Sequence, residues 1–232
     1  MIGLFCSCGN NSSQNGFRIG VDPLWYPEDF GPQNSYINGY TEDLLLEMAQ
    51  YSGARFELVR ASWDNLLDGL KNNQYDAVIT TLPPHEYNTA KYDFSDNLLD
   101  LGPVLITPNG SKKTDLDKLK GDLVGIIAND PAVLLLEKYP SVIIRNYHSI
   151  PELLNGVVQG EIQAAVLNQI PAVNYIGDLY AGVLQIEGKP MTGQGIHLVG
   201  PKGRLKALNQ TFEALRKKKK VDALLKKWEL AL

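Results

Sequence analysis

The sequence predicts an α/β protein with two lobes, each a parallel-type sheet flanked by helices. Two observations lead to this fold class. Strand-like and helix-like segments alternate before residue 97, and the same alternation recurs after residue 120. Such alternation is typical of parallel strands joined by helices that cover the sheet. The 232 residues suffice for two lobes of roughly 100 residues each.

In the first unit, strand and helix patterns follow one another closely. The segments with the apolar or alternating patterns of strands are 17–22, 55–60 and 77–81. Helices are predicted over 40–51, with Thr41 as N-cap and Gly53 as its stop, and over 63–73 after Ser62. Pro83 and Pro84 end the third strand because proline has no N–H to donate.

The second unit repeats the order, and a final section follows it. Its predicted strands are 103–108, 123–128, 142–147 and 164–168, and its predicted helices are 131–139, 150–160 and 169–180. Ser149 and Glu152 have the spacing of a capping box. The final section is predicted as a strand and two helices, over 195–201, 204–220 and 221–230.

One spacing is common to both units. The segment 66–69 (LLDG) lies eleven residues before one predicted strand, and 153–156 (LLNG) lies eleven residues before another. In that register Thr81 and Asn168 are equivalent, each at the C-terminal end of its strand. Ligands of open α/β sheets bind at these carboxyl ends. The sequence therefore predicts two lobes that face each other across a ligand site.

Charge is unevenly distributed along the chain. The formal net charge is −4, but residues 204–232 carry +6 and the remaining residues −10. Nucleic acid is not expected as a partner, because most of the surface would repel phosphate. The basic run Arg216–Lys220 is predicted to be a solvated face of a helix.

Both cysteines lie in the first eight residues, so a disulfide framework or thiol catalyst in the body of the chain is excluded. Residues 1–8 (MIGLFCSC) resemble the end of a lipoprotein signal with Cys8 as the acylated residue, and a polar tether continues to residue 16. The alternative is a frayed terminus, because no Lys or Arg precedes a short apolar run. No other stretch is long enough to span a membrane.

Catalytic, cofactor and metal sites are not expected. The three histidines, His85, His148 and His197, are scattered without metal-ligand spacing, and no carboxylate pair shares a motif.

Five segments resemble, in order, the extracytoplasmic solute-binding proteins of polar amino-acid ABC importers, which are bacterial solute-binding protein family 3 with the type II periplasmic-binding-protein fold. They are GVDPLWYP (20–27), GYTEDLLLEMA (39–49), YDFSDNLLDLGPVLIT (92–107), GIHLVGPKG (195–203) and LLKKW (224–228). The resemblance implies a periplasmic or cell-surface receptor that passes a small polar solute to an ABC permease, and we expect a monomer. The boundaries it implies are lobe 1 at 17–96 and 195–232, lobe 2 at 103–189, and hinges at 97–102 and 190–194.

The same resemblance assigns residues to the ligand site. Asp22 lies at the cleft-facing end of the first strand, and Thr80 and Thr81 end the third. Trp25 and Tyr40 match the two aromatic residues that sandwich the ligand, and such rings offer a large contact area. Packing in the core is the alternative for both.

Four positions depart from the family pattern. Asn88 replaces the arginine that holds an amino acid's carboxylate, and Pro83 replaces a residue that donates a backbone N–H. The turn of lobe 2 reads Asn129-Asp130-Pro131 instead of Gly, Ser or Thr, and Asn168 replaces the aspartate that binds the ammonium. Because charge-assisted bonds are lost on both sides, the ligand is expected to be atypical.

Two other functions remain open. A sensing or adhesion module could use the same fold without transport, and a neighbouring permease gene would argue against it. Some relatives with this fold are dehydratases, so fold alone does not exclude catalysis.

Overall fold

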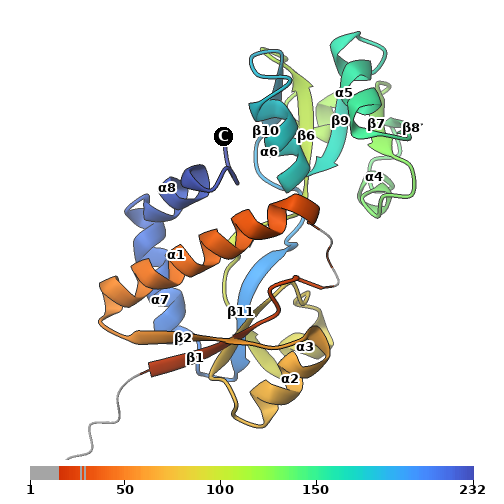
Figure 1. Cartoon of the computed structure of the whole chain (residues 1–232). Coiled ribbons are helices and arrows are strands. Elements are labelled where there is room, and N and C mark those ends of the chain that lie inside the picture. The colour runs from red at the N-terminus through yellow and green to blue at the C-terminus, as the bar shows by residue number, and fades with distance from the viewer. Residues whose placement is uncertain (1–15, 27, 29) are drawn as a thin grey trace, which may run out of the picture.

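Two separate sheets, connected by two adjacent segments, organise the chain. The computed structural model describes residues 16–26, 28 and 30–232. The first sheet contains β1 (Gly16–Val21), β2 (Arg55–Arg60), β3 (Ala77–Thr80), β4 (Tyr92–Phe94), β5 (Leu99–Asp100) and β11 (Gly195–Pro201). The second contains β6 (Pro103–Pro108), β7 (Leu123–Ile127), β8 (Ile143–Tyr147), β9 (Ala164–Asn168) and β10 (Leu184–Glu187). Figure 1 shows the two lobes that these sheets form.

Each sheet has a parallel centre with antiparallel additions. The strand orders are β2-β1-β3-β11-β4, with β5 also paired to β11, and β10-β6-β9-β7-β8. In the first sheet β2, β1 and β3 are parallel, and in the second β8, β7 and β9 are parallel. Strands β11 and β6 run antiparallel to these centres. Both begin just after the chain crosses between the lobes, so they enter their sheets in the opposite direction.

Helices cover both sheets, which confirms the α/β fold class. With the first sheet lie α1 (Asn34–Ser52), α2 (Trp63–Lys71), α3 (Glu86–Thr89), α7 (Lys206–Lys217) and α8 (Lys220–Lys227), and with the second α4 (Val133–Leu136), α5 (Ile150–Val158) and α6 (Gln169–Gly177). Two 3-10 helices, η1 (Gly31–Gln33) and η2 (Leu116–Leu119), complete the elements. Apart from Ile170 of α6, which packs with the first lobe, the apolar side chains of the two lobes form separate clusters, so each lobe has its own core.

The two crossings run side by side. Leu101 N donates to Gln194 O at 3.0 Å, and Met191 N donates to Pro103 O at 2.8 Å. After the second crossing, β11 joins the first sheet and α7 and α8 pack on α1. The C-terminal section therefore belongs to the same lobe as the N-terminal strands.

The start of α1 differs from the prediction. Thr41 was expected to cap the helix, but it lies in the second turn, where its Oγ1 donates to Ile37 O at 2.8 Å. Ile37 is fully buried in the core, so the apolar face of α1 extends further towards the N-terminus than predicted. The predicted stop is correct, since Gly53 has a φ of 71° and closes the helix in the left-handed conformation.

The other predicted helices are all shorter than expected, and one cap is confirmed. Helix α4 covers only 133–136 of the predicted 131–139. The predicted helix 204–220 ends at Lys217, because Lys219 adopts a φ of 56° between α7 and α8. The Ser149 hydroxyl accepts from Glu152 N at 3.4 Å, which is one of the two bonds of a capping box.

The basic run Arg216–Lys220 is exposed, in agreement with a solvated face. Arg216 pairs with Glu213 at 3.1 Å and Lys220 pairs with Glu47 at 3.6 Å. Within the described residues, none of the helices is both long and apolar enough to cross a bilayer. Cys8 lies outside the described residues, so the lipid anchor stays a prediction.

Candidate functional site

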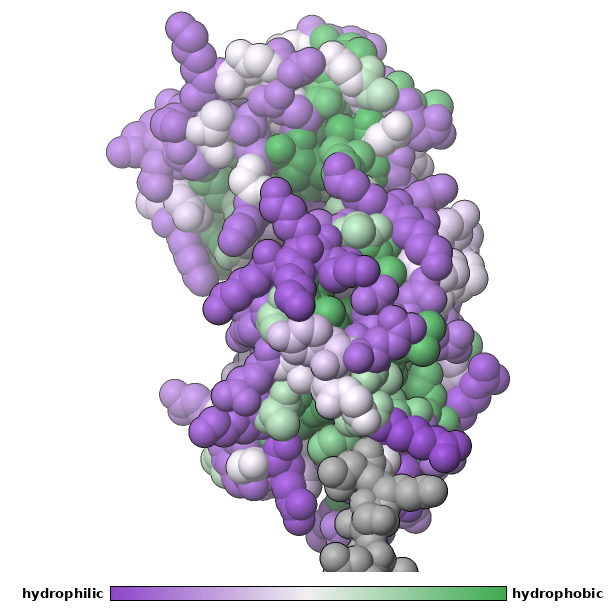
Figure 2. Space-filling view, turned by 90° about the vertical axis from the view of Figure 1, so that its left-hand side faces the viewer, coloured by the Kyte–Doolittle hydropathy of each residue, from purple (hydrophilic) through white to green (hydrophobic). Residues whose placement is uncertain are grey.

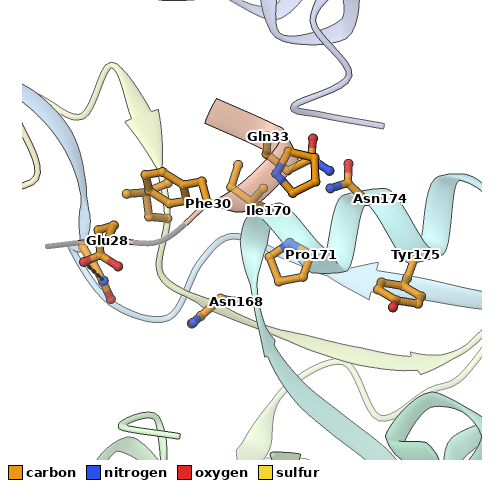
Figure 3. Close-up of a pocket in the computed structure, with 11 residues that line it drawn as sticks. Glu28, Phe30, Gln33, Asn168, Ile170, Pro171, Asn174 and Tyr175 are labelled. Carbon is orange, nitrogen blue, oxygen red and sulfur yellow. Dashed lines mark hydrogen bonds between the residues drawn. The ribbon is translucent and has the colours of Figure 1, made fainter. Parts of the chain in front are cut away.

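A pocket of about 350 Å³ lies between the lobes. Its volume falls in the range of small-molecule sites, about 300–1,000 Å³. The residues that line it come from the segment before α1, from both crossings, and from the end of β9 with the start of α6 (Figure 3): Glu28, Phe30, Pro32, Gln33, Leu101, Asn168, Ile170, Pro171, Asn174, Tyr175 and Gln194. Because residues from both lobes and both crossings line it, this pocket is the candidate functional site.

Asn168 enters the pocket at a strand-to-helix junction. It ends β9 with extended backbone angles (φ −61°, ψ 147°) at the N-cap position of α6, and its side chain makes no capping bond. An N-cap Asn normally accepts from its own helix, so this amide is left available. Asn174 and Tyr175 follow along α6 (Figure 3).

Glu28 supplies the charge of the pocket. Among the described residues that line the pocket, it is the only Asp, Glu, Lys or Arg. Its Oε1 accepts from Gln194 Nε2 at 3.2 Å, which joins the segment before α1 to the second crossing. The pocket is therefore anionic and contains no cationic side chain of the described residues.

Ile170 forms an apolar contact between the lobes. It is the second residue of α6, yet its side chain is only 4% exposed and belongs to the core cluster of the first lobe. Leu101 from the first crossing belongs to the same cluster. The pocket wall near the crossings is therefore formed by Ile170 and Leu101, which are buried in the core of the first lobe.

The two predicted stacking residues are buried in the first lobe. Trp25 is 2% exposed, and its Nε1 donates to Asn38 Oδ1 at 2.8 Å. Tyr40 is 1% exposed and its hydroxyl donates to Leu98 O, and burial raises the pKa of that hydroxyl. Neither lines the pocket, so their surroundings favour the alternative of core packing.

A different aromatic pair lies near the end of β1. The rings of Tyr26 and Trp63 meet edge to face, with centroids 6.2 Å apart and an interplanar angle of 62°. Tyr26 is exposed, and Trp63 begins α2 beside Asp22. Sequence analysis missed this pair, although Tyr26 adjoins Trp25.

The predicted polar residues of the first lobe bond mainly to nearby backbone. Asp22 accepts from Leu24 N at 2.9 Å through Oδ1 and from Trp63 N at 3.0 Å through Oδ2, so both oxygens are engaged. Thr80 Oγ1 accepts from Leu82 N at 3.2 Å. By contrast, Thr81 Oγ1 is buried without a hydrogen-bond partner among the described residues.

The predicted anchors at the loop after β3 and in the second lobe are also partly engaged. Asn88 is 3% exposed, and its Nδ2 donates to Pro83 O at 2.8 Å. Asp130 Oδ1 accepts from Ala132 N at 2.8 Å, and Asn129 is exposed with a φ of 65°. Of the nine predicted ligand residues, Asn168 alone lines the pocket, so a ligand role of the others stays a prediction.

A histidine network connects the first crossing to the loop after β3. His197 Nδ1 lies 2.7 Å from Asn97 Oδ1, and Nε2 lies 3.1 Å from Leu82 O. Asn97 also donates to Asp100 Oδ1 at 2.7 Å. Burial lowers the pKa of His197, although the bond to Leu82 O and the charge of Asp100 oppose this shift. These hydrogen bonds join the first crossing to β11 and to the loop after β3.

Comparison with known proteins gives consistent matches over nearly the whole chain. The sequence model of the bacterial extracellular solute-binding proteins, family 3, matches residues 17–231. A probable histidine-binding protein of Neisseria gonorrhoeae is 22% identical over 220 residues, which cover 91% of this chain and 82% of that protein.

Solved structures agree with this match. The L-cystine solute receptor of Neisseria gonorrhoeae in its unliganded open conformation has a TM-score of 0.70 at 16% identity, and 94% of each chain is covered. An ancestral cyclohexadienyl dehydratase has a TM-score of 0.68 at 17% identity, and the match covers 93% of this chain and 92% of that chain. At such identities the likeness shows the fold alone, which is the two-lobed type II fold.

Proposed function

Because this chain belongs to the bacterial extracellular solute-binding proteins of family 3, we propose that it captures a small polar solute between its lobes and delivers it to an ABC permease. The observation that carries this proposal is the interlobe pocket, which both lobes and both crossings line. Closure of the lobes around a solute would bury the solute and change the surface offered to the permease.

The domain boundaries follow from the same proposal. Lobe 1 comprises 17–96 and 195–232, lobe 2 comprises 103–189, and the hinges are 97–102 and 190–194. The paired backbone bonds between the two crossings support hinges at these positions. We propose that the receptor acts as a monomer.

The solute is proposed to be atypical for the family. Asn88 stands where relatives use an arginine, and its Nδ2 already donates to Pro83 O. A buried ionic group left without its partner costs on the order of a few kcal/mol, about two decades in affinity. We therefore expect every common free amino acid to bind no better than about millimolar in the usual pose.

Titration calorimetry of the full chain with the twenty common amino acids tests this expectation. Millimolar or weaker binding throughout is the expected result. Micromolar binding of any of them would show that the amino-acid anchors lie elsewhere on the chain.

Membrane attachment through Cys8 is a further part of the proposal. The sequence Ser7-Cys8 followed by a polar segment supports it. In a host that processes lipoproteins, the chain should partition into the detergent phase, and Cys8→Ser should release it while Cys6→Ser should not. Equal partitioning of all three proteins would rule out attachment through Cys8. One acyl chain alone binds membranes weakly, so modification with two or three is expected.

A further inference from the structure

The interlobe pocket points to a narrower class of solute. We propose that it binds an amine that lacks a carboxylate, with Glu28 as the counter-charge of the ammonium or guanidinium group. This inference rests on the proposed receptor function and adds the chemistry of the ligand.

The charge of the lining is the first argument. Glu28 is the one acidic side chain among the described residues that line the pocket, and none of those residues is Lys or Arg. A cation in a partly enclosed pocket is stabilised by a nearby carboxylate, because the attraction strengthens as water is excluded. A ligand carboxylate in the same space would meet repulsion from Glu28 and find no cationic partner.

Unused hydrogen-bonding capacity is the second argument. Among the described residues, the Glu28 carboxylate accepts one hydrogen bond, from Gln194, while a carboxylate can accept about four. The side chains of Asn168, Asn174 and Tyr175 make no hydrogen bond within the described part of the chain. An ammonium group has three donors and no acceptor, so a carboxylate and amide oxygens complement it.

Aromatic rings provide the third argument. Phe30 and Tyr175 line the pocket from different lobes and lie on opposite sides of Pro171 in Figure 3. Aromatic faces attract organic cations by about 0.5–2 kcal/mol. The apolar part of an amine can pack on the same rings.

Three positions that match carboxylate-binding positions of the family are also unsuited to that role. Asn88 Nδ2 is already bonded to Pro83 O, and neither Pro83 nor Pro131 has a backbone N–H. The departures at Asn88, Pro83 and Pro131 therefore disfavour a ligand carboxylate. Asn168 is neutral where the family pattern has an aspartate, so the counter-charge for a cation comes from Glu28.

Matched pairs of ligands test the inference. Agmatine and arginine, cadaverine and lysine, and histamine and histidine each differ only by a carboxylate. In calorimetric titrations of the full chain, at least one amine should bind about tenfold or more tightly than its parent amino acid, a difference of about 1.4 kcal/mol. The Glu28→Gln variant should lose most of that preference. Glu57→Gln serves as the control, because Glu57 is an exposed acid of the same lobe outside the pocket.

Several results would overturn the inference. Tighter binding of a parent amino acid than of its amine would reject the ligand class and leave the receptor function intact. Amine binding that Glu28→Gln does not weaken would reject the assigned counter-charge. Absence of binding by all three amines would also reject the inference, whereas receptor function is judged separately by closure of the lobes.

Discussion

At the level of single residues, polar side chains at the strand ends mostly serve the protein's own backbone. Asp22, Thr80 and Asp130 accept from backbone N–H groups two residues further on, and Asp22 also accepts from the first residue of α2. Tight turns after strands leave such N–H groups unpaired, and buried ones need acceptors. Asn168 and Glu28 keep hydrogen-bonding groups that no turn backbone engages, so these groups are available to a ligand.

Sequence reasoning located the ends of the predicted strands to within one residue, but it could not give the direction of the side chains. It identified Asn168 at the end of β9, and this residue lines the pocket. Trp25 occupies the expected loop, but its ring lies in the core beside Asn38, a residue of α1 that the predicted helix did not include. The resemblance to the family matched Trp25 to a position along the chain. Whether its side chain is buried depends on which helix packs over it, and that helix is α1.

Replacement of Trp25 distinguishes core packing from a stacking surface. Trp25→Ala should lower the free energy of unfolding by about 3–5 kcal/mol, because it removes a fully buried aromatic side chain. Urea denaturation monitored by circular dichroism measures the change. An unchanged midpoint together with lost solute binding would support the stacking role instead.

The buried His197 predicts a pH dependence of stability. Its pKa is lowered in the folded protein, so below the unfolded value of about 6.5 the unfolded chain binds more protons. The contribution of neutral His197 to the free energy of unfolding is fully present above the unfolded pKa, and it declines as the pH falls towards the folded pKa. Unfolding free energies measured between pH 7 and pH 5 should decrease, and less steeply in His197→Gln. Equal slopes for the two proteins would contradict this role.

At the level of elements, the contact between α1 and the segment after α8 joins the N- and C-terminal sections. Gly39 of α1 faces the ring of Trp228, and a Cβ at this position would overlap that ring. Trp228 Nε1 donates to Asp43 Oδ2 at 2.8 Å, and Lys227 pairs with the same carboxylate at 2.6 Å. Segments 39–49 and 224–228 were both identified by their resemblance to the family, but the sequence did not indicate that they are in contact.

Gly39→Ala tests this contact because two effects oppose each other. Alanine is favoured over glycine in a helix by about 1 kcal/mol. Overlap with the Trp228 ring should cost about 1–3 kcal/mol and outweigh that gain. A lower urea midpoint is expected for Gly39→Ala, and its recovery in Gly39→Ala/Trp228→Leu would show that the ring is the cause. A raised midpoint in the single variant would contradict the contact.

At the level of the whole molecule, two crossings run between the lobes through the middle of Figure 1. Ile170 of the second lobe also packs into the core cluster of the first. The alternation of strands and helices was sufficient to predict two α/β lobes. It could not reveal the antiparallel entry of β6 and β11, which depends on how the chain turns at the crossings. It predicted a ligand site between the lobes and Asn168 within it, but it did not identify Glu28, Gln194 or Tyr175, which come from three distant segments.

The polarity of the surface fits a receptor that works exposed to solvent. Figure 2 shows hydrophilic side chains spread over both lobes on one face, with hydrophobic ones scattered between them. The basic helices α7 and α8 are partly neutralised by acids, including Glu47 and Asp43 of α1.

Small-angle X-ray scattering of the full chain tests closure most directly. The titrations above first establish a saturating probe, with agmatine as the initial choice. If the chain is a two-lobed receptor, the radius of gyration should decrease on saturation, because the closed form brings the lobes together. Glu28→Gln, under the same agmatine concentration, should contract less. An unchanged scattering profile at verified saturation would contradict the account.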